Sequence, residues 1–194
     1  EGWRYTKLEE ILDELETGYR PKGGVRGITE GIPSVGAESI NGLAHFEMSQ
    51  LKYVPLDFFK SMKRGHVKDK DVLLYKDGGK PGQFKPKVAM YGRGFPFAEY
   101  CINEHVYRIR SIEPFCQSFL YLFLCSDSAT IEMKNRSTGA AVPGLNSTAL
   151  KSVPISLPSD SVANAFLVTV EPYIDKALTN AAECQTLAQL RDTL

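Results

Sequence analysis

The chain has 194 residues, of which 43% are hydrophobic and 24% are charged, and its formal net charge is zero. This composition is that of an ordinary folded protein and excludes general disorder, while the length suits one globular domain with a short appendage. A neutral total argues against a protein that coats polyanions with its whole surface. The longest apolar run, residues 115–125, is too short to cross a bilayer.

The four cysteines, at positions 101, 116, 125 and 184, include no Cys-x-x-Cys pair. A disulfide framework needs a regular cysteine pattern and a structural zinc site needs close pairs of ligands, so we expect free, buried thiols and no metal. The first eight residues carry charge and no apolar core, so we expect no secretory signal. These features together predict a protein of the reducing cytoplasm that binds no membrane.

The first predicted element is a helix over residues 8–15, because its apolar residues recur at helical spacing. Those residues are Leu8, Ile11, Leu12 and Leu15. Thr6 is placed to cap this helix, with Glu9 three positions later closing a capping box. Residues 20–31 then form a glycine-rich, basic loop.

The centre of the chain alternates short strand patterns with glycine and proline. A short strand and turn is predicted at residues 32–41, and strands at 51–54, near 67, and at 72–75, 88–91 and 106–110. An apolar pattern of Leu150, Val153, Ile155 and Leu157 leads to Pro158. A helical turn is predicted at residues 58–62, and a longer helix from 115 to 126 that extends toward Met133. We therefore predict an α+β fold, with a mixed, twisted β-sheet and flanking helices.

The most strongly charged segment runs from Lys60 to Arg93. It holds ten basic residues against three aspartates, a local charge of about +7 in a neutral chain. The strand predicted at 72–75 ends there in a turn of residues 76–83, which is rich in glycine and contains lysines and Gln83. Cations and hydrogen-bonding groups at one edge of a scaffold suit a polyanion with readable edges, so nucleic acid is the first candidate.

The C-terminal segment, residues 158–194, carries a narrow apolar stripe typical of a long helix of coiled-coil type. The stripe residues are Leu167, Val170, Ile174, Ala177, Ala181, Cys184, Leu187 and Leu190. Because Pro172 cannot sit inside a straight helix without a kink, we expect a short helix from Asp160 and a longer one from Glu171. The alternative to a partner helix is that this segment folds back on its own domain.

An ordered set of landmark positions, most of them apolar, glycine or proline, runs through nearly the entire chain. It comprises Trp3, Leu8, Ile11, Gly18, Pro21, Ile32, Pro33, Val35, Ile40, Gly42, Val67, Lys68, Asp71, Val72, Leu73, Leu74, Gly79, Gly82, Asn103, Val106, Ile109, Phe119, Leu120, Phe123, Leu124, Ser126, Gly139, Leu145, Asn146, Leu150, Val153, Pro154, Ile155, Pro158, Leu187, Leu190, Arg191, Asp192 and Leu194. Each position alone is a weak signal. In this order they resemble one half of the specificity subunit of type I restriction–modification systems.

Three departures from the family pattern stand out. Lys70 occupies a position, just before the strand aspartate, where the family usually has glycine, and residues 159–161 replace the usual proline and glutamine after Pro158. The largest departure is length, because such subunits carry two recognition domains and two conserved helices, and each domain reads one half of a split DNA target. This chain has one of each, so we expect a fragment, a truncated product or a half-subunit that dimerises through its tail.

The resemblance implies a DNA target recognition domain at residues 1–157 and a conserved helical spacer at residues 158–194. It implies recognition of double-stranded DNA without catalysis or cofactor, alongside modification (methyltransferase) subunits and, in some systems, a restriction subunit. The sequence agrees, since it lacks the Asn/Asp-Pro-Pro-Tyr/Phe turn of a methyltransferase. Its Gly78-Gly79-Lys80 run is followed by Pro81, where a phosphate loop needs Ser or Thr.

Two roles are expected among the basic and amide side chains. Base edges suit Gln83 and Arg136, followed by Arg20 and Arg26. Contacts to DNA phosphates are expected of Lys22, Lys80, Lys85, Lys87, Arg93 and Lys134. Lys76 is also expected to bind DNA, with no particular role assigned to it. For each lysine an ordinary solvated surface charge is the alternative. Two other functions stay open, namely a protein-interaction module that dimerises through its helix and a small nucleotide-using enzyme.

Overall fold

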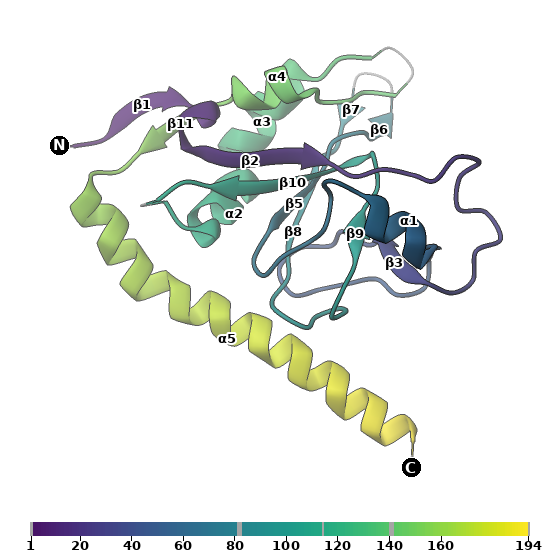
Figure 1. The fold of residues 1–194 in the computed structure, drawn as a ribbon. Coiled ribbons are helices and arrows are strands. Elements are labelled where there is room, and N and C mark those ends of the chain that lie inside the picture. The colour runs from purple at the N-terminus through teal and green to yellow at the C-terminus, as the bar shows by residue number, and fades with distance from the viewer. Residues whose placement is uncertain (1, 81–82, 114, 140–141, 194) are drawn as a thin grey trace.

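The computed structural model describes residues 2–80, 83–113, 115–139 and 142–193. Its centre is a four-stranded antiparallel sheet in the order β2-β10-β5-β8 (Figure 1). These strands are β2 (Leu12–Thr17), β10 (Val106–Ser111), β5 (Val72–Tyr75) and β8 (Lys87–Met90). The strands predicted at residues 72–75, 88–91 and 106–110 are thus confirmed to within a residue or two.

A second, three-stranded sheet has the order β4-β3-β9 and makes the fold mixed, because β3 and β9 run parallel while β3 and β4 run antiparallel. Its strands are β4 (Lys52–Val54), β3 (Ile32–Val35) and β9 (Cys101–Ile102), and α1 (Leu56–Ser61) follows β4. Phe59 and Met62 pack beside Val54 and Cys101 in a small separate cluster. The predicted α+β class with a mixed, twisted sheet is confirmed.

Both faces of the central sheet are buried. On β5, Val72 and Leu74 join the main core, whereas Leu73 joins a second cluster on the other face. This two-sided burial explains why β5 is a continuous apolar run rather than an alternating one. Helix α2 (Gln117–Cys125) covers the main-core face and contacts β5, β8 and β10.

The helix predicted over residues 8–15 is wrong. The segment instead forms β1 (Arg4–Lys7), a single 3-10 turn (Leu8–Ile11) and then β2. Leu8 and Ile11 enter the core from the turn, where the Leu8 amide donates to the Val153 carbonyl at 2.8 Å. From Leu12 onward the backbone pairs with β10, a partner some 90 residues away whose hydrogen bonds override the local helical spacing.

The helix predicted from residue 115 toward 133 is divided at Ser126. There the backbone is extended, and the Ser126 hydroxyl accepts a hydrogen bond from the amide of Ala129 and so caps α3 (Asp127–Arg136). A third short helix, α4 (Ser147–Lys151), precedes β11 (Pro154–Leu157). Strand β11 pairs antiparallel with β1, which brings Gly2 beside Ser159 at the base of the last helix.

The C-terminal segment forms one helix, α5 (Asp160–Asp192), that continues through Pro172, so the predicted division near Glu171 is wrong. Pro172 is exposed and so is Val168, whose carbonyl loses its intrahelical partner to the proline. Water can bond that carbonyl on the exposed side, which makes the proline tolerable. None of the described helices is long and apolar enough to span a membrane.

Helix α5 runs below the sheets, and its C-terminal end extends past them (Figure 1). Ile174 and Leu178 are buried in the main core, and Phe166 meets Phe119 of α2 edge to face at 5.8 Å. Gln185 donates to the Pro96 carbonyl at 2.9 Å. The greater part of α5 therefore folds back on its own domain.

Candidate nucleic-acid interface

The turn predicted at residues 76–83 is a small hairpin of β6 (Gly79–Lys80) and β7 (Gln83–Phe84), with residues 81 and 82 outside the described part. Phe84 is 2% exposed and anchors the hairpin in the main core. Gly79 has φ +110°, and a Cβ there would lie 1.8 Å from the Gln83 carbonyl oxygen, so only glycine fits. This scaffold leaves Lys80, Gln83 and Lys85 exposed.

A second segment, described at residues 138–139 and 142–145, lies against the base of this hairpin. The Gly78 amide donates to the Pro143 carbonyl at 2.9 Å, and the Leu145 amide donates to the Lys76 carbonyl at 2.7 Å. Thr138 and Gly144 exchange two further backbone hydrogen bonds. The fold thus joins two glycine-containing loops that lie about 60 residues apart in the sequence.

Lys134 and Arg136 lead into that second segment from the end of α3, but they differ in availability. Lys134 is exposed. The Arg136 guanidinium is engaged, because it pairs with Glu132 and its Nε donates to the Ser152 hydroxyl at 3.2 Å. Of the two residues favoured for base edges, Gln83 is therefore presented to solvent, whereas Arg136 would have to leave these partners to reach DNA.

Two lysines at the edges of the hairpin are also engaged. The Lys76 ammonium lies 2.9 Å from the Asp77 carboxylate and 5.7 Å from the centre of the Tyr107 ring. The Lys87 ammonium donates to the Ala37 carbonyl at 3.2 Å. Both contacts hold the ammonium groups against the domain, so these lysines are less available than Lys80 to bind a DNA phosphate.

The loop of residues 20–31 forms a separate basic region beside α1 and β4. Together with Leu51 and Lys52 it lines a cavity of about 510 Å³. Arg20 pairs with Glu104 at 3.2 Å, whereas Lys22 and Arg26 are exposed. This loop is the second surface that offers cations to a ligand.

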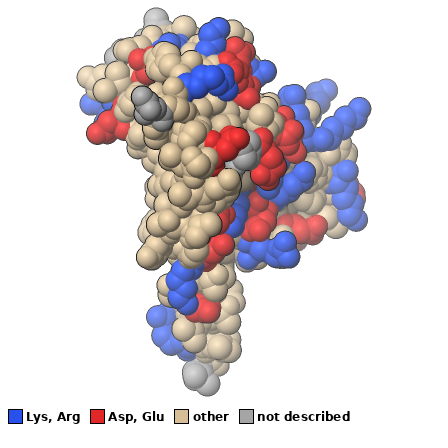
Figure 2. Space-filling model, turned by 90° about the vertical axis from the view of Figure 1, so that its left-hand side faces the viewer, with Lys and Arg blue, Asp and Glu red and all other residues tan. Residues whose placement is uncertain are grey.

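Arg93 is not brought to either region. It follows β8 at the end opposite Lys87 and lines a cavity beside α5 with Lys70 and Asp175. The prediction of one continuous cationic edge from Lys60 to Arg93 is wrong, because the fold divides the segment among several faces. Figure 2 shows basic and acidic side chains interleaved on one side of the molecule.

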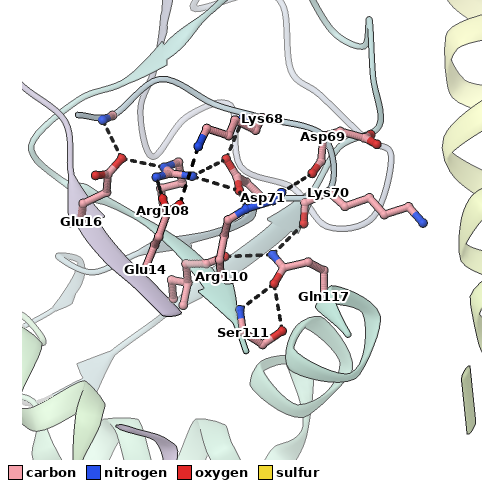
Figure 3. Close-up of polar contacts among 12 residues, drawn as sticks. Glu14, Glu16, Lys68, Asp69, Lys70, Asp71, Arg108, Arg110, Ser111 and Gln117 are labelled. Atoms are coloured by element: carbon pink, nitrogen blue, oxygen red, sulfur yellow. Dashed lines mark hydrogen bonds and ion pairs between the residues drawn. The ribbon is translucent and has the colours of Figure 1, made fainter. Parts of the chain in front are cut away.

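One charged residue of that segment, Asp71, is paired inside the protein. Arg108, from β10, is 3% exposed, and its guanidinium binds the carboxylates of Asp71, Glu14 and Glu16 (Figure 3). The Nη1–Oδ2 distance to Asp71 is 3.1 Å, and Arg110 reaches the other oxygen of Asp71 at 3.0 Å. Burial raises the pKa of Asp71 to about 7 and lowers the pKa of Arg108 to about 10.

The Arg108 cluster, meaning Arg108 with Asp71, Glu14 and Glu16, is the feature that the sequence analysis missed. One signal was present, since two arginines alternate in an otherwise apolar strand, and a buried strand carries a charge only where it is paired. Gln117 extends the cluster to α2, because its amide nitrogen donates to the carbonyls of Lys70 and Ile109 at 3.0 Å each.

No group of His, Cys, Asp and Glu among the described residues is arranged to hold a metal ion. The four cysteines are all free thiols. Cys101 is buried and Cys116 half-buried, but Cys125 and Cys184 are exposed, so the expectation of buried thiols is wrong for these two.

The profile of the type I restriction modification DNA specificity domain matches residues 1–183. The chain belongs to this family. The resemblance inferred from the ordered landmarks is thereby confirmed. No curated protein matches the chain.

Two solved structures share the fold of this specificity domain. The HsdS subunit from Thermoanaerobacter tengcongensis is similar over 97% of this chain and 40% of that one, with 18% identity and a TM-score of 0.53. The type I restriction-modification system S subunit from M. genitalium is similar over 86% of this chain and 38% of that one, with 12% identity and a TM-score of 0.52. The specificity domain thus spans about two fifths of the length of these subunits.

Proposed function

We propose that this chain reads one part of a double-stranded DNA target as the specificity component of a cytoplasmic type I restriction–modification complex. Residues 1–157 would form the target recognition domain, and residues 158–194 the conserved helical spacer. The chain would direct partner methyltransferase subunits, and a restriction subunit where one exists, without chemistry or cofactor of its own. The observation that carries the proposal is the hairpin with exposed Lys80, Gln83 and Lys85 in a protein of this family.

The hairpin suits DNA because it separates two tasks. Lys80 and Lys85 are flexible point charges that neutralise phosphates and release counterions, which supplies affinity and register. Gln83 can make two hydrogen bonds to one adenine edge in the major groove, which supplies discrimination. In the second basic region, the exposed Lys22 would contact a phosphate and the exposed Arg26 a base edge.

A selection from a random duplex library, with the methyltransferase subunit present, tests DNA recognition as a whole. One asymmetric motif is the expected result. If no preferred sequence emerges even at low salt, the proposal fails, and the protein-interaction module becomes the better interpretation.

The Lys80→Glu/Lys85→Glu variant then tests the hairpin on the selected duplex. We expect weaker binding and a plot of log affinity against log salt whose slope is shallower by about two, since each phosphate contact contributes ~0.9. The matched control is Lys7→Glu/Lys176→Glu, which reverses two charges away from the hairpin. Equal effects of the two variants would remove the hairpin from the interface.

The partner helix would bind the exposed part of the predicted stripe. Leu167, Val170, Ile174, Ala177 and Ala181 are half-buried or buried, whereas Cys184, Leu187 and Leu190 are exposed. Leu187 is 64% exposed and Leu190 57%. A partner, either a second recognition domain's helix or a second copy of this chain, would cover this distal stretch.

Two substitutions that introduce a charge on α5 distinguish the role of a residue in assembly from its role in folding. Leu187→Asp should abolish assembly without loss of stability, because the side chain is exposed in the single chain. Ile174→Asp should destabilise the chain itself, because Ile174 is buried in the main core. Mass measurement and thermal unfolding of both variants check this, and an unchanged assembly mass for Leu187→Asp would rule out the distal stretch as the seam.

A further inference from the structure

Lys70 occupies a backbone conformation that side chains avoid. Its φ is +59°, and among the described non-glycine residues only Ala44 shares a positive value. The surrounding structure holds it there, since the Lys70 amide donates to the Tyr91 carbonyl at 3.0 Å and its carbonyl accepts from Gln117. Glycine would fit this position without strain, so the lysine side chain must be explained by what it contacts.

That side chain reaches across to α5. Its ammonium lies 2.6 Å from Glu171 Oε1 and also pairs with Asp175, and the two carboxylates lie one helical turn apart on the same face of α5. Burial alone would lower the pKa of the Lys70 ammonium, but hydrogen bonds to Asp175 and Glu171 raise it above its ordinary value. Figure 3 shows the lysine extending away from the Arg108 cluster toward α5.

The other contacts of α5 are mostly apolar and do not define a direction. Ile174, Leu178 and Ala181 pack on the domain, and such contacts tolerate small slides and rotations of a helix. Cavities of about 540 and 450 Å³ lie between α5 and the domain, and Lys70 lines both, the first with Glu171 and the second with Asp175. Lys70 is thus a polar bridge between α5 and the domain, in addition to the hydrogen bond from Gln185 to the Pro96 carbonyl.

We propose that Lys70 is a positioning residue that fixes the register and rotation of α5 on the recognition domain. Tyr91 and Gln117 hold its backbone, and Glu171 and Asp175 receive its charge. The functional meaning of this role rests on the proposed function. There, the contact of Lys70 with Glu171 and Asp175 would set the angle between the DNA-reading hairpin and the distal stretch of α5. The spacing of a split target would then depend on a residue that touches neither DNA nor partner.

Two native thiols allow a direct measurement. Cys125 on α2 and Cys184 on α5 are exposed, while Cys101 is buried. Spin labels on this pair report the distance between the domain and α5 by pulsed electron resonance. The background is Cys116→Ser, whose hydroxyl can replace the Cys116 sulfur as acceptor for the Phe119 amide at the start of α2. We expect one narrow distance distribution in the parent chain and in Lys70→Arg, which keeps a cation for the two carboxylates.

The distribution should broaden or shift in two independent variants. Lys70→Gly removes the side chain and relieves the backbone, so loss of folding does not explain the change, and circular dichroism should stay unaltered. Glu171→Gln/Asp175→Asn removes the charges from the other side and leaves the Lys70 backbone intact. A narrow, unshifted distribution in either variant overturns the proposal.

The experiment is independent of DNA. If the library selection yields no motif but the distances respond as expected, the proposed function fails and the positioning role stands. If a motif is selected but the distances do not respond, the positioning role fails and the proposed function stands.

Discussion

Two groups of charged residues lie in the same domain, and the fold uses them in opposite ways. The Arg108 cluster draws a guanidinium and three carboxylates from separated segments into an interior where Asp71 is 1% exposed. The β6–β7 hairpin keeps its cations on the surface, and Lys80 and Lys85 make no ion pair with any described acidic residue.

The difference shows that local charge density is a poor guide to a binding face. In the basic segment, Lys68 and Lys70 are paired with acidic residues from β2 and α5, and these partners cannot be seen within the segment itself. Charge that remains after such pairing is the charge available to a ligand. In this domain such charge is found on the hairpin and on the loop of residues 20–31, and also at exposed cations outside them, among them Lys60, Lys63 and Lys134.

The largest effect should come from breaking the interior group. Arg108→Met would leave three carboxylates beside a buried apolar chain, and removing one partner of a buried ion pair costs about 3–5 kcal/mol of unfolding free energy. Urea unfolding at pH 8 measures it. Lys80→Met on the hairpin is the matched control and should change stability by less than about 0.5 kcal/mol; similar losses for both variants would erase the distinction between the two groups.

An effect of intermediate size is expected when the hairpin is altered, and it should change the discrimination between base pairs rather than the stability of the fold. Gln83→Ala should reduce discrimination at one base pair by about 1–3 kcal/mol, because a bidentate amide contact is lost. Arg136→Ala is the comparison, and we expect a smaller change since its guanidinium is already bound to Glu132 and Ser152. Competition binding with single-base substitutions of the selected duplex ranks the two, and the reverse order would move base reading to the end of α3.

The smallest effect is a pH dependence confined to the interior group. Burial raises the folded-state pKa of Asp71 to about 7 from an ordinary value of 3.8, so the folded chain holds a proton that the unfolded chain has released between those values. Stability contributed by this proton is complete below pH 3.8 and is lost as the pH rises through 7. Relative to Asp71→Asn, the parent chain should lose less than about 1 kcal/mol between pH 6.5 and 7.5, in urea unfolding. A parallel pH profile for the two proteins would show that Asp71 does not titrate there.

How much of this could be predicted from the sequence depended on the range of the contacts involved. The strand at 72–75 and the hairpin after it were predictable, because apolar residues and glycine turns act locally. The segment at 8–15 was not, since its pairing partner β10 lies far along the chain. A helical spacing of four leucines and isoleucines fits a 3-10 turn followed by a strand equally well once tertiary hydrogen bonds are available.

The same contrast between local and long-range contacts holds for the candidate site. Lys80, Gln83 and Lys85 were predicted as neighbours and are neighbours, because a two-strand hairpin is local. Arg93 was separated from them, and Arg136 was engaged, by contacts with residues that no local pattern connects to them. The strand order and ion pairs that decide these outcomes are properties of the whole fold.

The pairing of β1 with β11 has a consequence for how such a domain evolves. The polypeptide enters and leaves the recognition domain at one point, where Gly2 meets Ser159 at the root of α5 (Figure 1). The two ends of this part of the chain thus lie side by side, and it could be exchanged as a unit by a replacement that keeps the contacts of Lys70 and the core with α5. Under the proposed function, such an exchange would change the bases that are read.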